Sequence, residues 1–296
     1  MNPIIIDGKK TSLEIRQEVT EQVAQLKRET GIVPGLAVIL VGDDPASHSY
    51  VKSKEKACRD AGFYSITERL PASTQQAELM TLVRKFNDDP LIHGILVQMP
   101  LPHHIDEQTV IETIDPEKDV DGFHPVNVGR MMIGLDAFIP CTPAGIMELL
   151  KRWSIDPSGK HVVVAGRSNL VGKPIAMLLM QKKSGANAVV TMVHTGAHDI
   201  SIYTRQADIL IAAIGKPHVI TASMVKPGCV VIDVGINRIS DSNSKTGYRM
   251  VGDVDFDSVA PLAYAITPVP GGVGLMTIAL LLQNTLKATR NLLRKD

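Results

Sequence analysis

Short runs of consecutive apolar residues recur along this chain, and two of them lead directly into a glycine. Residues 36–41 precede Gly42, and residues 162–165 precede Gly166. A run that is apolar at every position, rather than at every second one, is typical of a strand buried on both faces of a parallel sheet. Amphipathic stretches with helical spacing separate these runs, so the sequence predicts an α/β protein.

The runs fall into two series, so the chain of 296 residues is expected to hold two domains. The first series has strands predicted over Ile4–Ile6, Leu36–Val41, Ser65–Leu70 and Gly94–Val97, with helices over 45–62 and 75–86. The second has strands predicted over His161–Ala165, Ala188–Val193, Asp208–Ala212 and Val230–Val234. A boundary near Pro140 gives a first domain over 1–139 and a second over 140–274. A long amphipathic helix over 275–293 is predicted to pack back on the first domain, which residues 275–296 would complete.

Two helix starts are marked by their residue types. Thr11 and Glu14 have the spacing of a capping box, which predicts that the first helix begins at Thr11. Thr142 is a suitable N-cap and Pro143 a suitable first helical residue, which predicts a helix from there through Leu150.

The overall composition argues against nucleic acid and membrane partners. The chain carries 31 Lys and Arg residues and 31 Asp and Glu residues, so its formal net charge is zero and no global field attracts a polyanion. Aromatic residues make up only 4%, which disfavours a base-stacking surface. No run approaches the roughly 18 consecutive apolar residues of a membrane-spanning helix.

The cysteines indicate a reducing compartment and no structural metal. Cys58, Cys141 and Cys229 are odd in number and far apart, and no CxxC pair exists. A disulfide framework and a structural zinc site are therefore not expected, and we predict a cytoplasmic protein without a metal. In the first ten residues the positive charges follow the apolar run, the reverse of the order in a secretory signal peptide.

A glycine-containing turn between a predicted strand and a predicted helix lies in residues 162–179. Gly166 ends the strand, and the helix opens near Gly172. Such a turn presents backbone N–H groups and a positive helix end to a phosphate. The match to GxGxxG is partial, because Ser168 and Val171 occupy the second and third glycine positions. From this segment alone, a nucleotide site and an ordinary tight turn are about equally supported.

The residues around this turn favour NADP over NAD. An NAD site usually has an acidic residue at the end of its second strand to bind the ribose 2′-hydroxyl, and residues 192–196 contain none. Arg167 lies in the turn, where its planar guanidinium suits a 2′-phosphate, and His194 can add to it. The alternative is that Arg167 is simply a solvated loop residue.

Tyr50 and Lys54 are four residues apart, so on a helix they share one face. Both follow the strand predicted over 36–41, at the edge of the sheet where α/β proteins bind ligands. The alternative is a surface helix, because Lys52 and Lys56 accompany Lys54 and lysine is usually solvated.

Gln98 follows another predicted strand, so its amide is expected at the same edge as Lys54, although a strand-end amide with a purely structural role is as well supported. Asp119 and Asp121 alternate around Val120 and face opposite ways if that segment is extended, with turn formation as the alternative to a ligand site.

A segment rich in proline and glycine precedes the last helix. Its residues are Pro268, Pro270, Gly271, Gly272 and Gly274. Such a backbone is stiff at the prolines and closely approachable at the glycines, which suits contact with a ligand. A plain interdomain linker is the alternative interpretation.

Together these segments resemble one family, the bifunctional methylenetetrahydrofolate dehydrogenase/methenyltetrahydrofolate cyclohydrolases (the FolD family). The resemblance runs from about Ile4 to the last helix. Its most specific stretches are residues 42–54 (Gly-x-x-x-Ala-Ser-x-x-Tyr-Val-x-x-Lys) and 270–277 (Pro-Gly-Gly-Val-Gly-x-Met-Thr), supported by 119–122, 166–174 and 233–237. It implies an N-terminal α/β catalytic lobe, an NADP-binding Rossmann domain and a C-terminal helix that packs back on the first lobe.

The resemblance also implies an activity and residue roles. The enzyme would oxidise 5,10-methylenetetrahydrofolate to the 5,10-methenyl form with NADP and then hydrolyse that to 10-formyltetrahydrofolate. Lys54 would be the acid/base, Gln98 its hydrogen-bond partner, Tyr50 a stacking residue and Asp121 a ligand of the pterin ring. The substrate-binding set would be Tyr50, Lys54, Val97, Gln98, Met99, Asp121, Pro268, Pro270, Gly271 and Gly272. The cofactor-binding set would be Gly166, Arg167, Ser168, Thr195 and Ile236. The family further implies a cytoplasmic homodimer in one-carbon metabolism, tetrahydrofolate interconversion and purine biosynthesis.

Two departures and two rival interpretations accompany the resemblance. Leu275 stands where the family usually has proline, and residues 195–197 lack a basic residue that many relatives carry. One rival is another two-domain NADP dehydrogenase, of the shikimate or amino-acid type, which does not predict Tyr50, Lys54, Gln98 and Asp121 together. The other is a folate- or nucleotide-binding protein without catalysis.

Overall fold

Two separate parallel sheets organise the chain, and each forms the centre of its own unit. The structure, a computed structural model, describes residues 2–242, 244 and 247–294. The first unit, here the six-stranded unit, comprises Met1–Ser12 and Thr142–Thr277. The second, here the three-stranded unit, comprises Leu13–Cys141 and Ile278–Asp296. For the functional domains, the sequence predicts residues 1–139 with 275–296 and residues 140–274, and these ranges stay a prediction. Their terminal residues Met1, Lys295 and Asp296 lie outside the described part.

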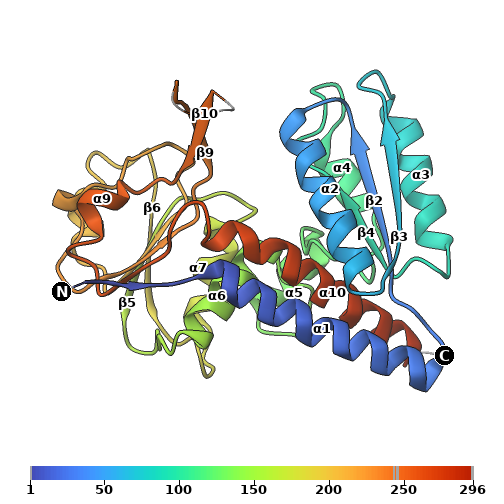
Figure 1. Cartoon of the computed structure of the whole chain (residues 1–296), viewed down its shortest axis with the longest axis horizontal. Coiled ribbons are helices and arrows are strands. Elements are labelled where there is room, and N and C mark those ends of the chain that lie inside the picture. The colour runs from blue at the N-terminus through green and yellow to red at the C-terminus, as the bar shows by residue number, and fades with distance from the viewer. Residues whose placement is uncertain (1, 243, 245–246, 295–296) are drawn as a thin grey trace. The chain divides into compact units, whose positions relative to one another are not determined.

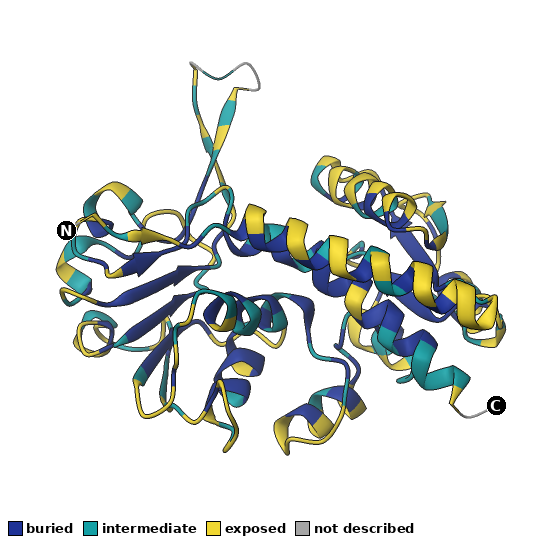
Figure 2. Ribbon diagram, turned by 60° about the horizontal axis from the view of Figure 1, so that its bottom comes forward, coloured by how far each residue is buried: buried dark blue, intermediate teal, exposed yellow. Residues whose placement is uncertain are grey.

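The three-stranded unit holds a parallel sheet in the order β3-β2-β4, with β2 at Gly35–Val41, β3 at Tyr64–Leu70 and β4 at Gly94–Val97. The crossovers through α2 (Pro45–Asp60) and α3 (Gln76–Asp88) run in opposite directions, so right-handed connections place these helices on opposite faces of the sheet (Figure 1). Every residue of β2 is buried, as predicted from its unbroken apolar run (Figure 2).

The rest of this unit includes two short helices and most of two long ones. The short helices are α4 at Glu107–Thr113 and α5 at Pro125–Met132, and the long ones are α1 at Gly8–Thr30 and α10 at Met276–Leu293. In Figure 1, α1 and α10 run side by side, and Arg290 donates a hydrogen bond to Gln22 at 3.0 Å. Asn284 Nδ2 donates to the carbonyl of Val120 at 2.8 Å. The predicted packing of the C-terminal helix on the first lobe is therefore confirmed.

The six-stranded unit holds an entirely parallel sheet in the order β1-β11-β8-β7-β5-β6. Its strands are β1 at Ile4–Ile5, β5 at His161–Ala165, β6 at Val189–Val193, β7 at Ile209–Ala212, β8 at Val230–Asp233 and β11 at Ala265–Ile266. The helical elements are α6 at Cys141–Arg152, α7 at Gly172–Met180, α8 at Ser201–Thr204, η1 at Ala222–Met224, α9 at Phe256–Val259 and η2 at Val273–Leu275. All residues of β7 and β8 are buried, as expected of a parallel sheet covered on both faces.

The N-terminal strand differs from its expected position. We grouped Ile4–Ile6 with the first series of strands, but β1 pairs with β11, with Ile4 opposite Ala265. The strand has only two residues, and both are exposed, so it has no pattern of buried and exposed positions that would assign it to a sheet.

The start of the first helix also differs from the prediction. The helix begins at Gly8, and Asp7 rather than Thr11 caps it, because the Asp7 carboxylate accepts the N–H of Lys10 at 2.9 Å. Thr11 instead donates its hydroxyl to the Asp7 carbonyl. An aspartate was an equally suitable cap, and the capping-box spacing at Thr11 was misleading.

An antiparallel hairpin interrupts the second series and was not predicted. It consists of β9 at Asn237–Ser240 and β10 at Tyr248–Val251, between β8 and α9. Figure 1 shows it extending from the end of the six-stranded sheet, and Arg238 lies over the Tyr248 ring at 4.9 Å. Among the helices that the structure describes, none is both long and apolar enough to cross a bilayer.

Candidate functional site

Helix α2 places Lys54 in the three-stranded unit. The helix follows β2 directly, with Asp44 as N-cap accepting the Ser47 N–H at 2.7 Å and Pro45 in the first turn. Lys54 is partly buried, whereas Lys52 and Lys56 are exposed, and Lys56 forms an ion pair with Asp60. The surface-helix interpretation therefore suits the two flanking lysines but not Lys54.

Gln98 meets Lys54 at the end of β4. Its backbone N–H donates to the carbonyl of Ile39, which continues the pairing of β4 with β2 by one residue. The Gln98 Oε1 accepts a hydrogen bond from Lys54 Nζ at 2.9 Å, and Gln98 Nε2 donates to the Met99 carbonyl at 2.7 Å. The second bond fixes the orientation of the amide, so its oxygen is the atom that faces the ammonium group.

Asp119 forms the turn that carries Asp121. Its buried carboxylate accepts four hydrogen bonds, from the backbone N–H groups of Gly122, Phe123 and His124 and from Asn127 Nδ2. Burial raises the pKa of Asp119, and these donors oppose that rise. Asp119 thus stabilises a turn, in line with the turn interpretation, and this turn holds the Asp121 carboxylate in place.

Asp121 is partly buried and lies within the field of Lys54. Burial raises its pKa to about 6, while the positive charge of Lys54 acts in the opposite direction. The Sγ of Cys141 lies 3.9 Å from Asp121 Oδ1 and 3.6 Å from the carbonyl oxygen of Val120. Burial raises the pKa of the Cys141 thiol well above its usual range, so this neighbour is a neutral thiol. Cys141 was not among the site residues predicted from the sequence.

The remaining predicted residues of this unit lie around Lys54. Tyr50 is one helical turn before it and is 39% exposed, which leaves its ring accessible. Val97 is the last residue of β4 and is buried, and Met99 is partly buried. Lys54, Gln98 and Asp121 thus form a polar cluster at the carboxyl end of the sheet, with Tyr50 exposed beside it.

The predicted proline–glycine residues Pro268, Pro270, Gly271 and Gly272 belong to the six-stranded unit, between β11 and α10. The first turn of α1 holds this segment: Lys9 N–H donates to the Gly271 carbonyl at 3.0 Å, and Ser12 Oγ donates to the Leu275 carbonyl at 2.9 Å. A Cβ on Gly8 would lie 2.1 Å from the carbonyl oxygen of Gly272. The segment is fixed by these contacts, which disfavours the interpretation as a plain linker.

A cavity of about 370 Å³ opens at the carboxyl ends of β5, β6 and β7. This is the switch point of the sheet, because the chain leaves β5 toward β6 on one side and returns to β7 on the other, and doubly wound proteins bind ligands there. The lining residues are Ala165, Gly166, Arg167, Ser168, Val193, His194, Thr195, Ile200, Ala213, Ile214, Lys216 and Val219. Ile236 is not in this set; its side chain lies against Gly274, where a Cβ would be 2.7 Å from Ile236 Cδ1.

Two glycines make the turn at this cavity possible. Gly166 has φ +138°, and a Cβ there would lie 2.1 Å from the Ala213 carbonyl oxygen. A Cβ on Gly172 would lie 2.4 Å from the Gly166 carbonyl oxygen, so the start of α7 packs tightly on the turn. Ser168 Oγ accepts the N–H groups of Val171 and Gly172. Glycines placed where backbone segments approach this closely are the feature that the dinucleotide-binding turn requires.

Arg167 and His194 present two hydrogen-bond donors to each other across the cavity entrance. His194 Nδ1 accepts the Gly196 N–H at 3.0 Å, so a neutral His194 ring carries its proton on Nε2. Arg167 Nη1 lies 3.4 Å from that same Nε2, with Arg167 exposed and His194 half-buried. Because two facing donors are best satisfied by an anion between them, these residues fit the 2′-phosphate of NADP.

Among residues 2–242, 244 and 247–294, no group of three or more His, Cys, Asp or Glu side chains is arranged to hold a metal ion. The three cysteines are free and buried.

Comparison with known proteins gives a consistent result over both units. The model of the tetrahydrofolate dehydrogenase/cyclohydrolase catalytic domain matches residues 6–121, and that of the NAD(P)-binding domain matches residues 140–293. The Bifunctional protein FolD of Chlorobium phaeobacteroides is 58% identical over 290 residues, which is 97% of this chain and 98% of that protein.

Solved structures agree with this result. The methylenetetrahydrofolate dehydrogenase-cyclohydrolase (FolD) of Trypanosoma brucei, complexed with NADP cofactor and inhibitor, is 40% identical with a TM-score of 0.94 and covers 99% of each chain. A shikimate dehydrogenase in complex with NADP+ has 12% identity and a TM-score of 0.52, over 88% of this chain and 95% of that one, so it shares the fold alone. The chain belongs to the tetrahydrofolate dehydrogenase/cyclohydrolase family.

Proposed function

We propose that this protein oxidises 5,10-methylenetetrahydrofolate to 5,10-methenyltetrahydrofolate with NADP and then hydrolyses the methenyl compound to 10-formyltetrahydrofolate. The observation that carries the proposal is the 2.9 Å hydrogen bond between Lys54 Nζ and Gln98 Oε1, in a chain of this family. A partly buried lysine that is held by a neutral amide, rather than by a carboxylate, keeps its remaining N–H directions free for reacting groups.

Lys54 is the proton-transfer group of the hydrolysis. The amine form takes a proton from water as the water oxygen adds to the methenyl carbon. The resulting ammonium returns that proton to the ring nitrogen as the bond between this nitrogen and the carbon breaks, and the hydroxyl proton of the adduct is released to solvent as the formyl C=O forms. Gln98 acts through Lys54 by fixing the direction of Nζ. The binding of Gln98 Nε2 to the Met99 carbonyl supports this role, because it prevents the amide from turning away.

Asp121 and the exposed ring of Tyr50 hold the folate. Asp121 offers carboxylate oxygens at the edge of the cluster, which suit the adjacent N–H donors of a pterin ring, and Tyr50 offers a flat surface for the aminobenzoyl group. Val97 and Met99 line the same edge of the sheet. Pro268, Pro270, Gly271 and Gly272 are assigned to folate binding on the family resemblance alone.

Gly166, Arg167, Ser168, Thr195 and Ile236 bind NADP. NADP, when bound, supplies the acceptor for the hydride that leaves the methylene carbon. The turn at Gly166 orients the dinucleotide, and Arg167 with His194 selects the 2′-phosphate. Ile236 joins this set on the family resemblance alone.

The cellular setting is also part of the proposal. We assign the protein to the cytoplasm as a homodimer that serves tetrahydrofolate interconversion and purine biosynthesis. The family resemblance supports these assignments, and the three free, buried cysteines are consistent with a reducing compartment.

The test is to mix the purified protein with 5,10-methylenetetrahydrofolate and either NADP or NAD, and to follow cofactor reduction and methenyl formation together by absorbance. We expect rapid reduction of NADP, slower reduction of NAD, and little accumulation of the methenyl compound. Accumulation of that compound to the level set by spontaneous hydrolysis would show that the protein does not catalyse the hydrolysis. The absence of reduction with both cofactors would overturn the proposal.

A further inference from the structure

Two buried carboxylates outside the sites described so far meet at the end of β8. Asp233, the last residue of β8, is 3% exposed, and Asp253, which follows β10, is fully buried. Neither belongs to a metal cluster among the described residues, and neither lines the cavity at β5–β7. Burying two carboxylates side by side is costly, so the arrangement needs a compensating function or strong hydrogen bonding.

Asp233 accepts hydrogen bonds from three backbone N–H groups. Its Oδ1 accepts from Gly235 at 2.9 Å and from Asp253 at 3.0 Å, and its Oδ2 accepts from Val254 at 3.0 Å. Both oxygens are therefore used. Burial raises the pKa of Asp233 to about 6, and the nearby charge of Asp253 adds to that rise.

Asp253 connects two other segments. Its Oδ2 accepts the backbone N–H groups of Ile214 at 2.5 Å and Gly215 at 2.8 Å, and its Oδ1 accepts from Asn237 Nδ2 at 2.9 Å. Ile214 lines the cavity at β5–β7, and Gly215 lies between it and Lys216, which also lines the cavity. One side chain thus ties the loop after β7 to the base of the β9–β10 hairpin.

The backbone around the pair leaves room only for these two carboxylates. A Cβ on Gly252 would lie 1.7 Å from Asp233 Oδ2, and a Cβ on Gly235 would lie 2.2 Å from Asp253 Oδ1. The N–H groups of Ile214 and Gly215 are bonded to Asp253 rather than left for a ligand. The shape of this side of the cavity therefore depends on where Asp253 lies.

We propose that Asp233 and Asp253 are positioning residues for the dinucleotide: Asp253 holds the Ile214–Lys216 wall of the cavity, and Asp233 holds Asp253. The inference rests on the proposed binding of NADP to this cavity. Neither carboxylate touches the cofactor. Asp253 acts through the backbone of residues 214–216, and Asp233 acts through Asp253.

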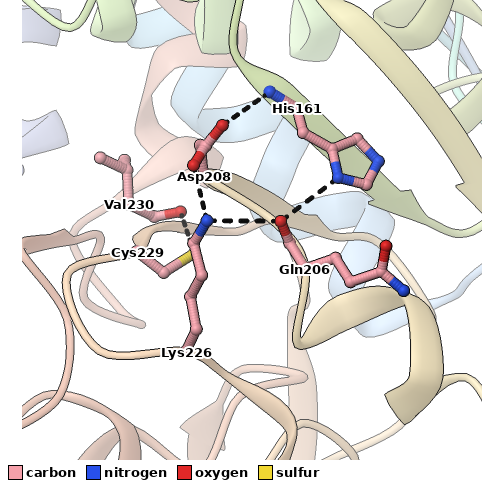
Figure 3. A network of polar contacts seen from close by, with 6 residues as sticks. All are labelled: His161, Gln206, Asp208, Lys226, Cys229 and Val230. Atoms are coloured by element: carbon pink, nitrogen blue, oxygen red, sulfur yellow. Dashed lines mark hydrogen bonds and ion pairs between the residues drawn. The ribbon is translucent and has the colours of Figure 1, made fainter.

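The chain offers a control at the opposite ends of the same strands. Asp208 immediately precedes β7, and its carboxylate accepts the backbone N–H of His161 at 2.8 Å and pairs with Lys226 at 2.6 Å (Figure 3). Like Asp253 it ties loops of the six-stranded unit together, but none of these residues lines the cavity. If the Asp233–Asp253 pair had a purely structural role, disrupting its hydrogen bonds or those of Asp208 would lower stability and leave NADPH affinity unchanged.

The two carboxylates differ in how well an amide can replace them. In Asp253→Asn, the amide oxygen can face Ile214 and Gly215, and rotation of the Asn237 amide presents an acceptor to the new NH2 group. In Asp233→Asn no rotation helps, because both oxygens accept backbone N–H groups and one of these must face the NH2 group. The isosteric replacements should therefore behave differently.

The experiment measures NADPH dissociation constants by fluorescence titration for the wild type, Asp233→Asn, Asp253→Asn, Asp253→Ala and Asp208→Asn. We expect Kd to rise about tenfold in Asp233→Asn and about 10- to 100-fold in Asp253→Ala, on the scale of lost hydrogen bonds to a charged group. We expect Kd within about threefold of wild type in Asp253→Asn and Asp208→Asn. The KM for NADP should rise with Kd, while hydrolysis of methenyltetrahydrofolate without cofactor should be retained.

Unchanged NADPH affinity in both Asp233→Asn and Asp253→Ala would overturn the inference, even if their melting temperatures fall. Should Asp253→Ala not fold, Asp233→Asn decides the question, because it conserves side-chain volume. Loss of methenyl hydrolysis in proportion to NADPH affinity would likewise contradict it, since that would indicate general disruption. Failure of the wild type itself to bind NADPH would overturn the proposed function instead.

Discussion

The two candidate sites of this protein differ in what forms them: side chains in the three-stranded unit and mainly backbone in the six-stranded unit. In the three-stranded unit the cluster consists of partly buried side chains: Lys54 and Gln98 are bonded to each other, and Asp121 lies in the field of Lys54 beside the Cys141 thiol. In the six-stranded unit the cavity is shaped by backbone, through Gly166 and a loop that Asp253 holds, and its charged side chains are exposed.

Under the proposed function, the difference means that side chains supply the chemistry in one unit and backbone supplies the orientation in the other. Proton transfer requires a particular functional group at one point, which only a side chain can supply. Orientation of a long dinucleotide requires a surface of fixed shape, for which glycine and backbone are suited. A substitution in one site should therefore leave the activity of the other measurable, and four substitutions test that separation.

The largest effect is expected for Lys54→Met. The substitution keeps most of the length of the side chain and removes its amine, so hydrolysis of methenyltetrahydrofolate should fall by about 10²- to 10⁴-fold, while NADPH binding stays unchanged. The matched control is Lys52→Met on the same helix, which should retain hydrolysis because Lys52 is exposed. Full hydrolytic activity in a folded Lys54→Met protein would refute the assignment.

Gly166→Ala should damage the other site. The new Cβ would lie 2.1 Å from the Ala213 carbonyl oxygen in an unfavourable backbone conformation, so we expect a loss of about 3 kcal/mol in the free energy of unfolding. NADPH affinity should fall as well, while hydrolysis without cofactor persists at temperatures where the protein is folded. Gly129→Ala is the control, because a Cβ there meets nothing within 4 Å. Wild-type NADPH affinity in Gly166→Ala would contradict the role given to the turn.

Arg167→Ala should change specificity rather than orientation. Loss of a charged donor to the 2′-phosphate should lower kcat/KM with NADP by about 10- to 100-fold and leave kcat/KM with NAD within about twofold. Steady-state kinetics with both cofactors measure the ratio, and the exposed Arg205 of the same unit supplies an Arg→Ala control. An unchanged NADP/NAD ratio would assign the discrimination to other residues.

Asp121→Asn should give the smallest change, and one of opposite sign. Burial raises the pKa of Asp121 from 3.8 to about 6, so ionisation destabilises the folded protein. That destabilisation is absent below pH 3.8, grows between pH 3.8 and about 6, and is complete above it. Partial exposure limits it to about 1 kcal/mol.

Urea unfolding of Asp121→Asn should accordingly show a gain over wild type of about 1 kcal/mol at pH 7 and none near pH 4. Folate affinity should fall in the same variant, because the amide replaces a carboxylate acceptor. Equal stability of the two proteins at pH 7 would show that the charge on Asp121 does not destabilise the folded protein.

Much of the sheet architecture could be predicted because buried parallel strands have unbroken apolar runs. The strand predicted over His161–Ala165 and that over Gly94–Val97 have the same bounds in the structure. No helix or strand was predicted within residues 102–140, yet this region contains α4 and α5. These helices have seven and eight residues, too few for helical periodicity to be visible, and α5 is capped by His124, an unusual N-cap residue.

The candidate sites were predictable where a residue type has chemical meaning by itself. Lys54, Gln98 and Arg167 were identified from motifs, and the hydrogen bond between Lys54 and Gln98 is present, while their catalytic and binding roles stay predictions. Cys141 and the Asp233–Asp253 pair were not identified. They matter through long-range packing: the two aspartates are brought together by a hairpin that the sequence pattern did not indicate.

The pairing of β1 with β11 has a consequence for the order in which the chain can assemble. Ile4 has its partner at Ala265, so β1 stays unpaired until the chain through β11 has been synthesised. The three-stranded unit has the same dependence, because Gln22 and Val120 bond to residues of α10, which is synthesised after them. Neither unit is a contiguous piece of the polypeptide, so the segment from β11 through α10 completes both, and nascent chains must keep two unfinished cores from aggregating until it is made.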